Sequence, residues 1–452
     1  MSAINNLADF LTRISFVGLP SETVESAKMH LLDTLGAMLA GVRTPEGAAI
    51  GRFLARFKAR PGIPVIGYNI QTPLLPAIIA QCSATRSTEI DDIHLESCTT
   101  PGSVVIPTAL SMASGGYISS SEELLVAITV GYEFLIRVGL AVGGGRVLYR
   151  GVWPTYLAAT AGSVAVAARA LGLVNQQATS AISMALAMSA GTPIHSKDTV
   201  TSRWLTIGVA AQNGVIAALS AQEGFTADDL PLDKPSGRIC GLQLSQEALT
   251  DDLKQRYLID QTGMKPYPVA RQALPAIEGF RDIIGTDHVN PESIQEIIVW
   301  VPGNFMSIID KPQMPDNRLQ TISSVQYQIA LAAFDPDGLF DIRREQVNCD
   351  TRVRNLMNKV QVRPSRELER SYPSVWGARV EVKTEERGHS RTILYPKGDP
   401  RSIMNWEEVV AKFKWLAGPV LGDRSAAEVI DFVGTMENQE SLSSLLESLT
   451  LS

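Results

Sequence analysis

Cysteine is scarce in this sequence, and the few cysteines stand far apart. The 452 residues contain four of them, Cys82, Cys98, Cys240 and Cys349, with no CxxC pair and no histidine cluster beside them. So few thiols in so long a chain argue against a disulfide framework, and a tetrahedral zinc site needs clustered Cys or His ligands. We therefore expect buried free thiols in a reducing compartment, and no metal site.

The sequence also lacks an excess of basic residues and any long uninterrupted apolar run. Forty Lys and Arg stand against 47 Asp and Glu, for a net charge of −7, which argues against a nucleic-acid binder. The most apolar stretch, 158–173, is interrupted by Arg169, so we expect no membrane span. Residues 1–9 are polar, unlike a secretory signal. A composition of 45% hydrophobic residues is typical of a globular protein, here of more than one domain and cytoplasmic.

Apolar residues recur at helical spacing through the first part of the chain. The pattern that begins at Ser21 predicts a helix ending near Gly41. Further helices are predicted over 75–87, 103–114, 121–141, 155–172, 175–190 and 203–223. Gly172 and Gly224 stand where helices commonly end. Strands do not alternate with these helices, so we expect an all-helical domain without a Rossmann-type sheet.

The pattern changes after about residue 264. Segments rich in β-branched residues predict strands at 293–302, 360–362, 378–383 and 391–395, the last two joined by a polar turn at 384–390. Helical patterns lie near 269–284 and 323–334, and helices resume at 406–416, 426–433 and 441–449. The predicted fold is therefore mainly α. A large helical domain (1–265 plus 400–452) carries a smaller inserted α+β lid domain (266–399).

The densest polar cluster is the segment 89–96, with sequence EIDDIHLE. It places four carboxylates and a histidine between two apolar helices. Carboxylates held close together shift one another's pKa, which suits proton transfer near neutral pH. A solvated loop with helix-capping Asp residues explains the same spacing, so the segment alone does not establish a site.

Six segments in order make the chain resemble the MmgE/PrpD family, which includes 2-methylcitrate dehydratase, cis-aconitate decarboxylase and iminodisuccinate epimerase. They are LLDTLGAMLAG (31–41), EIDD (89–92), GYEFLIRVG (131–139), WPTYLAATAGSVAVAARALGL (153–173), GVAAQNGVIAALSAQEGFTA (208–227) and KPYP (265–268). The resemblance implies a helical domain, an α+β lid and an active site between them, usually in a homodimer. It implies no metal and no organic cofactor. Family members use acidic residues, histidines and lysines to move protons on a polycarboxylate.

Carried over residue by residue, the resemblance keeps only part of this site. The expected catalytic residues that survive are Glu89, Asp91, Asp92 and Lys265. The positions of the family's histidines hold Thr100, Trp153, Ala270 and Leu274, and a lysine position holds Arg203. None of these replacements titrates near pH 7 as imidazole does, and arginine, unlike lysine, cannot give up a proton.

Other residues near these positions are candidates for lining the pocket: His94, Tyr149, Arg150 and Tyr156. His195 lies in a polar loop, and a surface position explains it better than the site.

Three interpretations remain open. The favoured one is an enzyme with a refitted, more apolar pocket that isomerises, eliminates from or cyclises a small molecule that is not a tricarboxylate, in a setting such as secondary metabolism. The second is an ordinary lyase of the family, of the 2-methylcitrate dehydratase or cis-aconitate decarboxylase type. The third is an inactive homologue that acts as a partner subunit.

Overall fold

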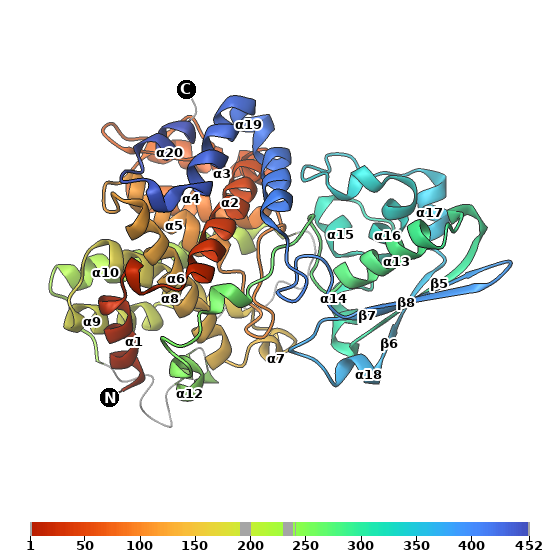
Figure 1. Ribbon diagram of the computed structural model, residues 1–452, viewed down its shortest axis with the longest axis horizontal. Coiled ribbons are helices and arrows are strands. Elements are labelled where there is room, and N and C mark those ends of the chain that lie inside the picture. The colour runs from red at the N-terminus through yellow and green to blue at the C-terminus, as the bar shows by residue number, and fades with distance from the viewer. Residues whose placement is uncertain (1, 190–199, 229–237, 240, 451–452) are drawn as a thin grey trace. The chain divides into compact units, whose positions relative to one another are not determined.

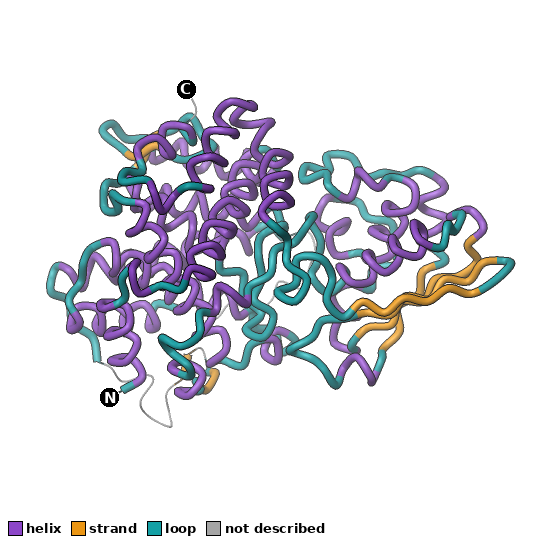
Figure 2. The backbone as a smooth tube through the Cα atoms, viewed as in Figure 1, coloured by secondary structure: helices purple, strands orange, loops and turns teal. Residues whose placement is uncertain are grey.

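The computed structural model describes residues 2–189, 200–228, 238–239 and 241–450 (Figure 1). The chain divides into two compact units. Unit 1 contains most of residues 1–264 together with 405–452, and unit 2 contains residues 265–404. The fold is mainly α, as predicted, and the four-stranded sheet belongs to unit 2 (Figure 2).

Helices of unit 1 pack around a largely apolar core. The longer ones are α1 (Ala3–Arg13), α2 (Ser21–Val42), α3 (Pro45–Leu54), α4 (Leu74–Ser87), α5 (Gly102–Ser114), α6 (Ser121–Ala141), α8 (Pro154–Ala170), α9 (Asn175–Ala187), α10 (Ser202–Gln222) and α19 (Trp406–Gly434). Short helices are α7 (Gly145–Leu148), α12 (Gln246–Thr250) and α20 (Ser443–Ser448). Gly172 and Gly224 follow the ends of α8 and α10 with positive φ, as predicted for helix termini.

The central helix of unit 1 is α6, whose most apolar window is 94% buried. A capping box starts it, because the Ser120 hydroxyl accepts from Glu123 N–H while the Glu123 carboxylate accepts from the Ser120 N–H. By length and composition α6 and α10 resemble membrane-spanning helices, but α6 packs against α5 and α8 as a core helix does. The corresponding window of α10 is 56% buried.

The long helix α19, near the end of the chain, packs along α2, so segments nearly 400 residues apart lie side by side (Figure 1). A kink interrupts α19 at Gly422, where φ is 77°. At the C-terminal end of α2, a Cβ added to Gly41 would lie 2.0 Å from the carbonyl oxygen of Ala84. Only glycine allows α2 and α4 to approach this closely, which explains one residue of the 31–41 motif.

Unit 2 is built on a sheet with strand order β6-β5-β7-β8. The strands are β5 (Ile294–Val301), β6 (Val360–Pro364), β7 (Ala378–Thr384) and β8 (Gly388–Ile393). β5 runs parallel to β6 and antiparallel to β7, which forms a hairpin with β8. Buried residues alternate along β7, and α13 (Leu274–Thr286) packs on β7, β8 and α16 (Val325–Phe334). Shorter helices are α14 (Met306–Ile309), α15 (Arg318–Ser323), α17 (Thr351–Met357) and α18 (Arg366–Glu369).

Several local predictions need correction. Unit 1 is not purely helical, since β1 (Ile63–Pro64) pairs with β2 (Gln71–Thr72) and β3 (Arg238–Ile239) pairs with β4 (Leu242–Gln243). The turn of the β7–β8 hairpin is shorter than predicted, because β8 already begins at Gly388. Cys82 and Cys98 are buried free thiols, but Cys349 is exposed. Cys240 and His195 lie outside the described residues.

Candidate functional site

The acidic segment 89–94 is a tightly held loop that follows α4. Glu89 has a φ of 58°, in the left-handed region that a non-glycine side chain rarely adopts. Two antiparallel bridges fix the segment, one between Ile93 and Gly263 and one between His94 and Thr99. Glu89, Asp91, Asp92 and His94 are all buried. Residues 89–95 are therefore not solvated, whereas Glu96 is exposed, and the helix-capping Asp of that interpretation is found in Asp92, which accepts from Gly102 N–H at the start of α5.

Arg86, in the last turn of α4, pairs with two carboxylates of the segment. Its Nη1 lies 2.7 Å from Glu89 Oε2 and 3.1 Å from Asp91 Oδ1. Burial opposes the charge of Arg86, but Asp91 and Glu89 outweigh burial and raise its pKa above the ordinary value. An arginine at this position stays charged, and two carboxylates within ion-pair distance stabilise that charge. Glu89 and Asp91 therefore face a permanent cation.

Aromatic side chains and a second arginine surround this ion-pair cluster. The Arg86 guanidinium lies 5.7 Å from the ring centre of Trp153, and the Trp153 and Tyr156 rings are 5.7 Å apart. Arg203 Nη2 lies 3.6 Å from Glu89 Oε1. We define the acid–arginine cluster as Arg86, Glu89, Asp91 and Arg203; its two positive and two negative charges balance.

Trp204, next to Arg203 at the start of α10, also contacts the cluster. Its indole Nε1–H donates to Glu89 Oε1 over 3.2 Å. The Arg203 guanidinium lies 5.1 Å from the centre of the same indole ring. Burial raises the pKa of Tyr156, so its phenol stays protonated near neutral pH. Glu89 is thus held by Arg86, Arg203 and Trp204 together.

Asp92 points away from this cluster and ties helices together. Its Oδ1 accepts from Gly102 N–H over 2.8 Å at the start of α5. Its Oδ2 accepts from the Tyr132 hydroxyl of α6 over 2.6 Å and lies 3.0 Å from His30 Nδ1 of α2. A Cβ at Gly102 would come within 2.8 Å of Asp92 Oδ1, so this approach requires glycine. These contacts support a positioning role for Asp92.

Lys412 of α19 fixes the same segment from another side. Its Nζ donates to the carbonyl oxygen of Ile90 over 3.2 Å and pairs with Asp33 Oδ1 of α2 at 2.5 Å. Burial raises the pKa of Asp33 and the charge of Lys412 opposes that rise. Lys412 therefore connects α19 to the acidic segment through the hydrogen bond to Ile90, and to α2 through the buried ion pair with Asp33.

His94 is buried in a hydroxyl-rich turn. Its Nδ1 accepts from Ser97 N–H over 3.3 Å and lies 2.9 Å from Ser97 Oγ, which in turn lies 2.7 Å from Thr99 Oγ1. Burial lowers the pKa of His94 to about 3, with a smaller contribution from the positive charge of Arg256. His94 is therefore neutral at physiological pH.

This shift predicts a pH dependence of stability. The folded pKa lies below the ordinary His value of about 6.5, so unfolding takes up a proton as the pH falls below 6.5. Between pH 6.5 and pH 5, His94 is expected to cost the folded state up to about 1.4 kcal/mol per pH unit. The free energy of unfolding of wild type and His94→Asn, measured in urea from pH 7.5 to 5, should diverge accordingly. Parallel pH profiles of the two proteins would contradict the shift.

The other candidates of unit 1 lie close to the segment or outside it. Thr100 N–H donates to Thr155 Oγ1 over 3.2 Å, and Thr155 is the neighbour of Tyr156 in α8. Tyr149 is half-buried and Arg150 is exposed in the turn between α7 and α8. The contacts described above thus gather Glu89, Asp91, Trp153, Tyr156 and Arg203, with Thr100 nearby, whereas Arg150 does not take part in them.

Lys265, Ala270 and Leu274 belong to unit 2. Lys265 and Leu274 are buried, and Leu274 opens α13. Arg344, whose pKa burial lowers to about 10, donates to the carbonyl oxygen of Pro268 at 3.4 Å and to Thr321 Oγ1 at 2.9 Å. The KPYP segment that carries Lys265 is therefore anchored within its own unit.

Arg86, Trp204 and the buried network were missed by sequence reasoning. Arg86 is the one charged residue in the helix α4, and a lone charge in such a helix signals a buried ion pair. Asp33 is likewise a charge inside an apolar helical pattern, which signals a buried pair. Lys412, about 380 residues away from it, gives no such local signal.

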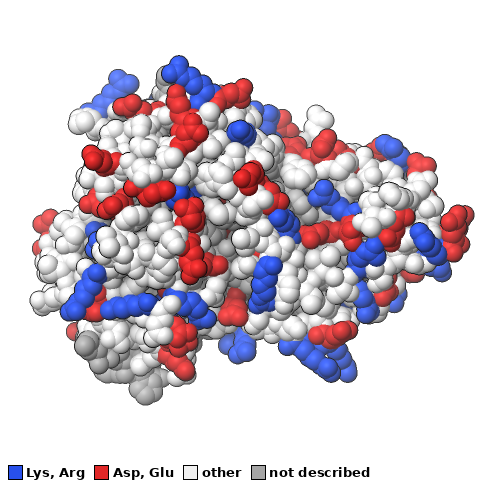
Figure 3. Space-filling model, viewed as in Figure 1, with Lys and Arg blue, Asp and Glu red and all other residues white. Residues whose placement is uncertain are grey.

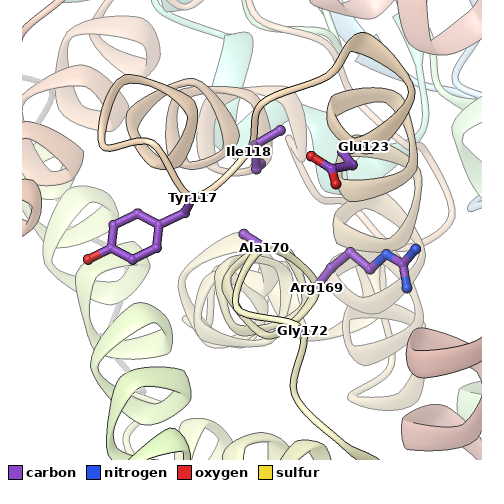
Figure 4. Close-up of a pocket in the computed structure, with 6 residues that line it drawn as sticks. All are labelled: Tyr117, Ile118, Glu123, Arg169, Ala170 and Gly172. Atoms are coloured by element: carbon purple, nitrogen blue, oxygen red, sulfur yellow. The ribbon is translucent and has the colours of Figure 1, made fainter.

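Small cavities elsewhere in unit 1 offer less chemistry than this cluster. One of about 250 Å³ lies beside α6 and the end of α8 (Figure 4). Figure 4 shows Tyr117 pointing away from Arg169 and Glu123, and Glu123 is already used in the capping box.

On the face in Figure 3, acidic and basic side chains of the described residues are interspersed. Across residues 2–189, 200–228 and 241–450, no group of three His, Cys, Asp or Glu is arranged to hold a metal ion.

Comparisons with known proteins cover both parts of the chain. The MmgE/PrpD N-terminal domain matches residues 5–247, and the MmgE/PrpD C-terminal domain matches residues 267–438. The cis-aconitate decarboxylase of Aspergillus terreus is 23% identical over 463 residues, which cover 95% of this chain and 92% of that protein. A cis-aconitate decarboxylase-like protein, oryM of Aspergillus oryzae, is 23% identical over 97% of this chain and 95% of its own length. Human cis-aconitate decarboxylase is 24% identical over 94% of this chain and 90% of its own length. The resemblance found in the sequence is confirmed, and the chain belongs to the MmgE/PrpD family.

Proposed function

We propose that this protein is an MmgE/PrpD enzyme that isomerises, eliminates from or cyclises a small molecule other than a tricarboxylate. The observation that carries the proposal is the pairing of Arg86 with Glu89 and Asp91. A carboxylate held at 2.7 Å from a buried guanidinium has its charge stabilised, so it is a poor proton donor. The two acids best placed for catalysis are thereby committed to ion pairs.

Charge balance supports the same choice of substrate. Binding several carboxylates favours an excess of cationic groups, because each desolvated anion needs a partner. In the acid–arginine cluster, Arg86 and Arg203 are already matched by Glu89 and Asp91. The neighbouring rings of Trp153 and Tyr156 instead offer apolar surface that restrains a less polar substrate. Restraint of a reactive conformation supplies several kcal/mol of a barrier.

The second candidate function is that of an ordinary family lyase. The relatives named above favour it, since cis-aconitate decarboxylases align with nearly the whole chain. In that case other groups would replace the imidazoles absent at Thr100, Trp153, Ala270 and Leu274. Lys265, the surviving lysine of the family pattern, would then be a candidate titratable group for the reaction.

Comparative metabolite profiling tests the proposal. A strain of the source organism that lacks this gene should accumulate a compound without three carboxylates. Purified protein should convert that compound with no change of formula, for isomerisation or cyclisation, or with loss of a small neutral molecule, for elimination. Accumulation of cis-aconitate or a methylcitrate would support the lyase, and conversion of nothing would support the inactive partner subunit.

Trp153 should form one wall of the pocket in the favoured function. On the compound identified by profiling, Trp153→Ala is expected to lower kcat/KM by at least about tenfold, whereas Trp153→Phe keeps a flat apolar face and most of the activity. Steady-state kinetics of both variants give the comparison. Equal losses in both variants would show that the indole N–H, rather than the ring surface, matters.

We also propose that the protein is a cytoplasmic homodimer without a metal or organic cofactor. Large apolar side chains exposed on unit 1 include Phe57, Leu205 and Val209, and such surface is commonly buried between subunits. Light scattering at micromolar concentration should give twice the chain mass of 48.8 kDa. A value of one chain mass would contradict the dimer, and loss of activity in EDTA would contradict metal independence.

A further inference from the structure

Tyr156 carries a hydroxyl group that has no hydrogen bond to the described part of the chain. The residue lies in the first turn of α8 and is 4% exposed. Its ring centre lies 5.7 Å from that of Trp153, the half-buried residue just before the helix. The Tyr156 N–H donates to the carbonyl oxygen of Trp153, but among residues 2–189, 200–228 and 241–450 none forms a hydrogen bond with the hydroxyl. The ring is thus held by packing, while the hydroxyl is unused there.

Two other tyrosines of unit 1 use their hydroxyl groups inside the fold. Tyr132 donates to Asp92 Oδ2 over 2.6 Å, and Tyr68 donates to the carbonyl oxygen of Gly47 over 2.9 Å. Taking a polar group out of water without giving it a partner costs free energy. The hydroxyl of Tyr156 therefore adds nothing to stability that a phenylalanine would not supply, which indicates a use outside the fold.

The Tyr156 hydroxyl is within reach of a small molecule. Polar atoms of unit 1 that have no partner and are sealed from solvent include Ser83 Oγ and Ser183 Oγ. The Tyr156 oxygen is not one of them, so the small exposed part of this residue includes its hydroxyl. An unused donor in contact with solvent is available to a bound molecule.

The surroundings of this hydroxyl combine balanced charges with an aromatic ring. Burial is the main cause that raises the pKa of Tyr156, and all four members of the acid–arginine cluster act on that pKa as well. The phenol therefore stays protonated near neutral pH and is a neutral donor. The two positive and two negative charges of the cluster balance, so they offer no net attraction to an anion. A neutral donor beside the Trp153 ring favours an uncharged acceptor.

We propose that the Tyr156 hydroxyl donates a hydrogen bond to an uncharged oxygen of the substrate, a carbonyl or a hydroxyl group. The inference rests on the proposed function, which places a less polar molecule against Trp153, and it adds the group by which that molecule is recognised. A site that holds a hydrogen-bond donor rejects an analogue without the acceptor, because the donor is then left buried and unpaired. Tyr156 is therefore a residue that determines specificity.

A matched pair of variants tests whether the hydroxyl lacks a partner in the fold. Tyr68→Phe removes a hydroxyl that donates to Gly47, so its urea midpoint should fall below that of wild type. Tyr156→Phe should keep the wild-type midpoint or exceed it. Urea unfolding of the full-length protein, followed by far-UV circular dichroism, gives both values without any substrate. A fall in Tyr156→Phe equal to that in Tyr68→Phe would show a structural partner and overturn the proposal.

Steady-state kinetics test the contact with the substrate. On the compound identified by profiling, Tyr156→Phe should lower kcat/KM at least about tenfold, and Tyr68→Phe should leave it unchanged. An analogue of that compound with the acceptor oxygen replaced by a methylene group should lose at least about tenfold with wild type, but nothing further with Tyr156→Phe. A full loss for the analogue with Tyr156→Phe, or an undiminished kcat/KM of this variant, would overturn the proposal. So would a compound that has no uncharged oxygen.

Failure of this inference is distinguishable from failure of the proposed function. Undiminished turnover of the profiled compound by Tyr156→Phe refutes the hydrogen bond and leaves the proposed function standing. Turnover of cis-aconitate by wild type contradicts the proposed function, and the uncharged acceptor is refuted with it, whatever the stability result.

Discussion

Purified protein is expected to convert neither cis-aconitate nor 2-methylcitrate at a rate above that of heat-inactivated protein. Moving a proton at one carbon and releasing carbon dioxide or water at the next requires groups that titrate near neutral pH. Thr100, Trp153, Ala270 and Leu274 occupy the positions where the family resemblance places imidazoles, and none of them transfers a proton there. Each general acid or base contributes about 10²- to 10⁴-fold to a rate, so the loss of several removes practical turnover.

The measurement is product formation by chromatography over a range of substrate concentrations and pH. The cis-aconitate decarboxylase of Aspergillus terreus, assayed in parallel, is the positive control, because it aligns over 95% of this chain. A kcat within about tenfold of that control would contradict the refitted pocket and establish the lyase function. Binding of cis-aconitate without turnover would instead favour the inactive partner subunit.

The helices and strands were largely predictable from sequence because each is a local pattern. The stretch 121–141 is apolar at helical spacing and is the helix α6 with the same bounds. The hairpin β7–β8 was predicted with its turn too long, since turn residues such as Gly388 are also tolerated at a strand end. The use of 266–399 as a lid came from the family resemblance and stays a prediction.

The position of the acidic segment was predictable from the sequence, but the partners of its side chains were not. Glu89, Asp91 and Asp92 are one sequence cluster, yet the structure gives them different partners: Arg86 for the first two, and Tyr132, His30 and the start of α5 for Asp92. Which way Asp92 points depends on helices that lie tens of residues away along the chain. Spacing along the chain holds no information on that packing. The sequence therefore suggested a cluster for proton transfer, whereas the structure shows ion pairs and contacts that hold helices together.

Replacing Arg86 by methionine is expected to lower the free energy of unfolding of unit 1 by about 3–5 kcal/mol. Methionine fills a similar apolar volume, but Glu89 and Asp91 are then left buried without their shared cation. Removing one partner of a buried ion pair costs this much because the remaining charge stays desolvated. Urea unfolding followed by far-UV circular dichroism and tryptophan fluorescence gives the value, with the transition of unit 1 fitted separately if the two units unfold in steps.

Matched variants show whether the loss comes from charge. Arg424→Met removes the ion pair to Glu428 on the exposed side of α19, and it should cost no more than about 1 kcal/mol, as surface pairs do. Arg86→Met combined with Glu89→Gln and Asp91→Asn should regain part of the lost stability, because the two carboxylates no longer carry charge, while Arg203 stays charged without Glu89. The deficit of the single variant should also shrink as the pH falls, since protonation discharges the two carboxylates. A loss below about 1 kcal/mol at neutral pH would mean that Glu89 and Asp91 are not committed to Arg86. They would then be available as acids, and the argument against a tricarboxylate substrate would lose its main support.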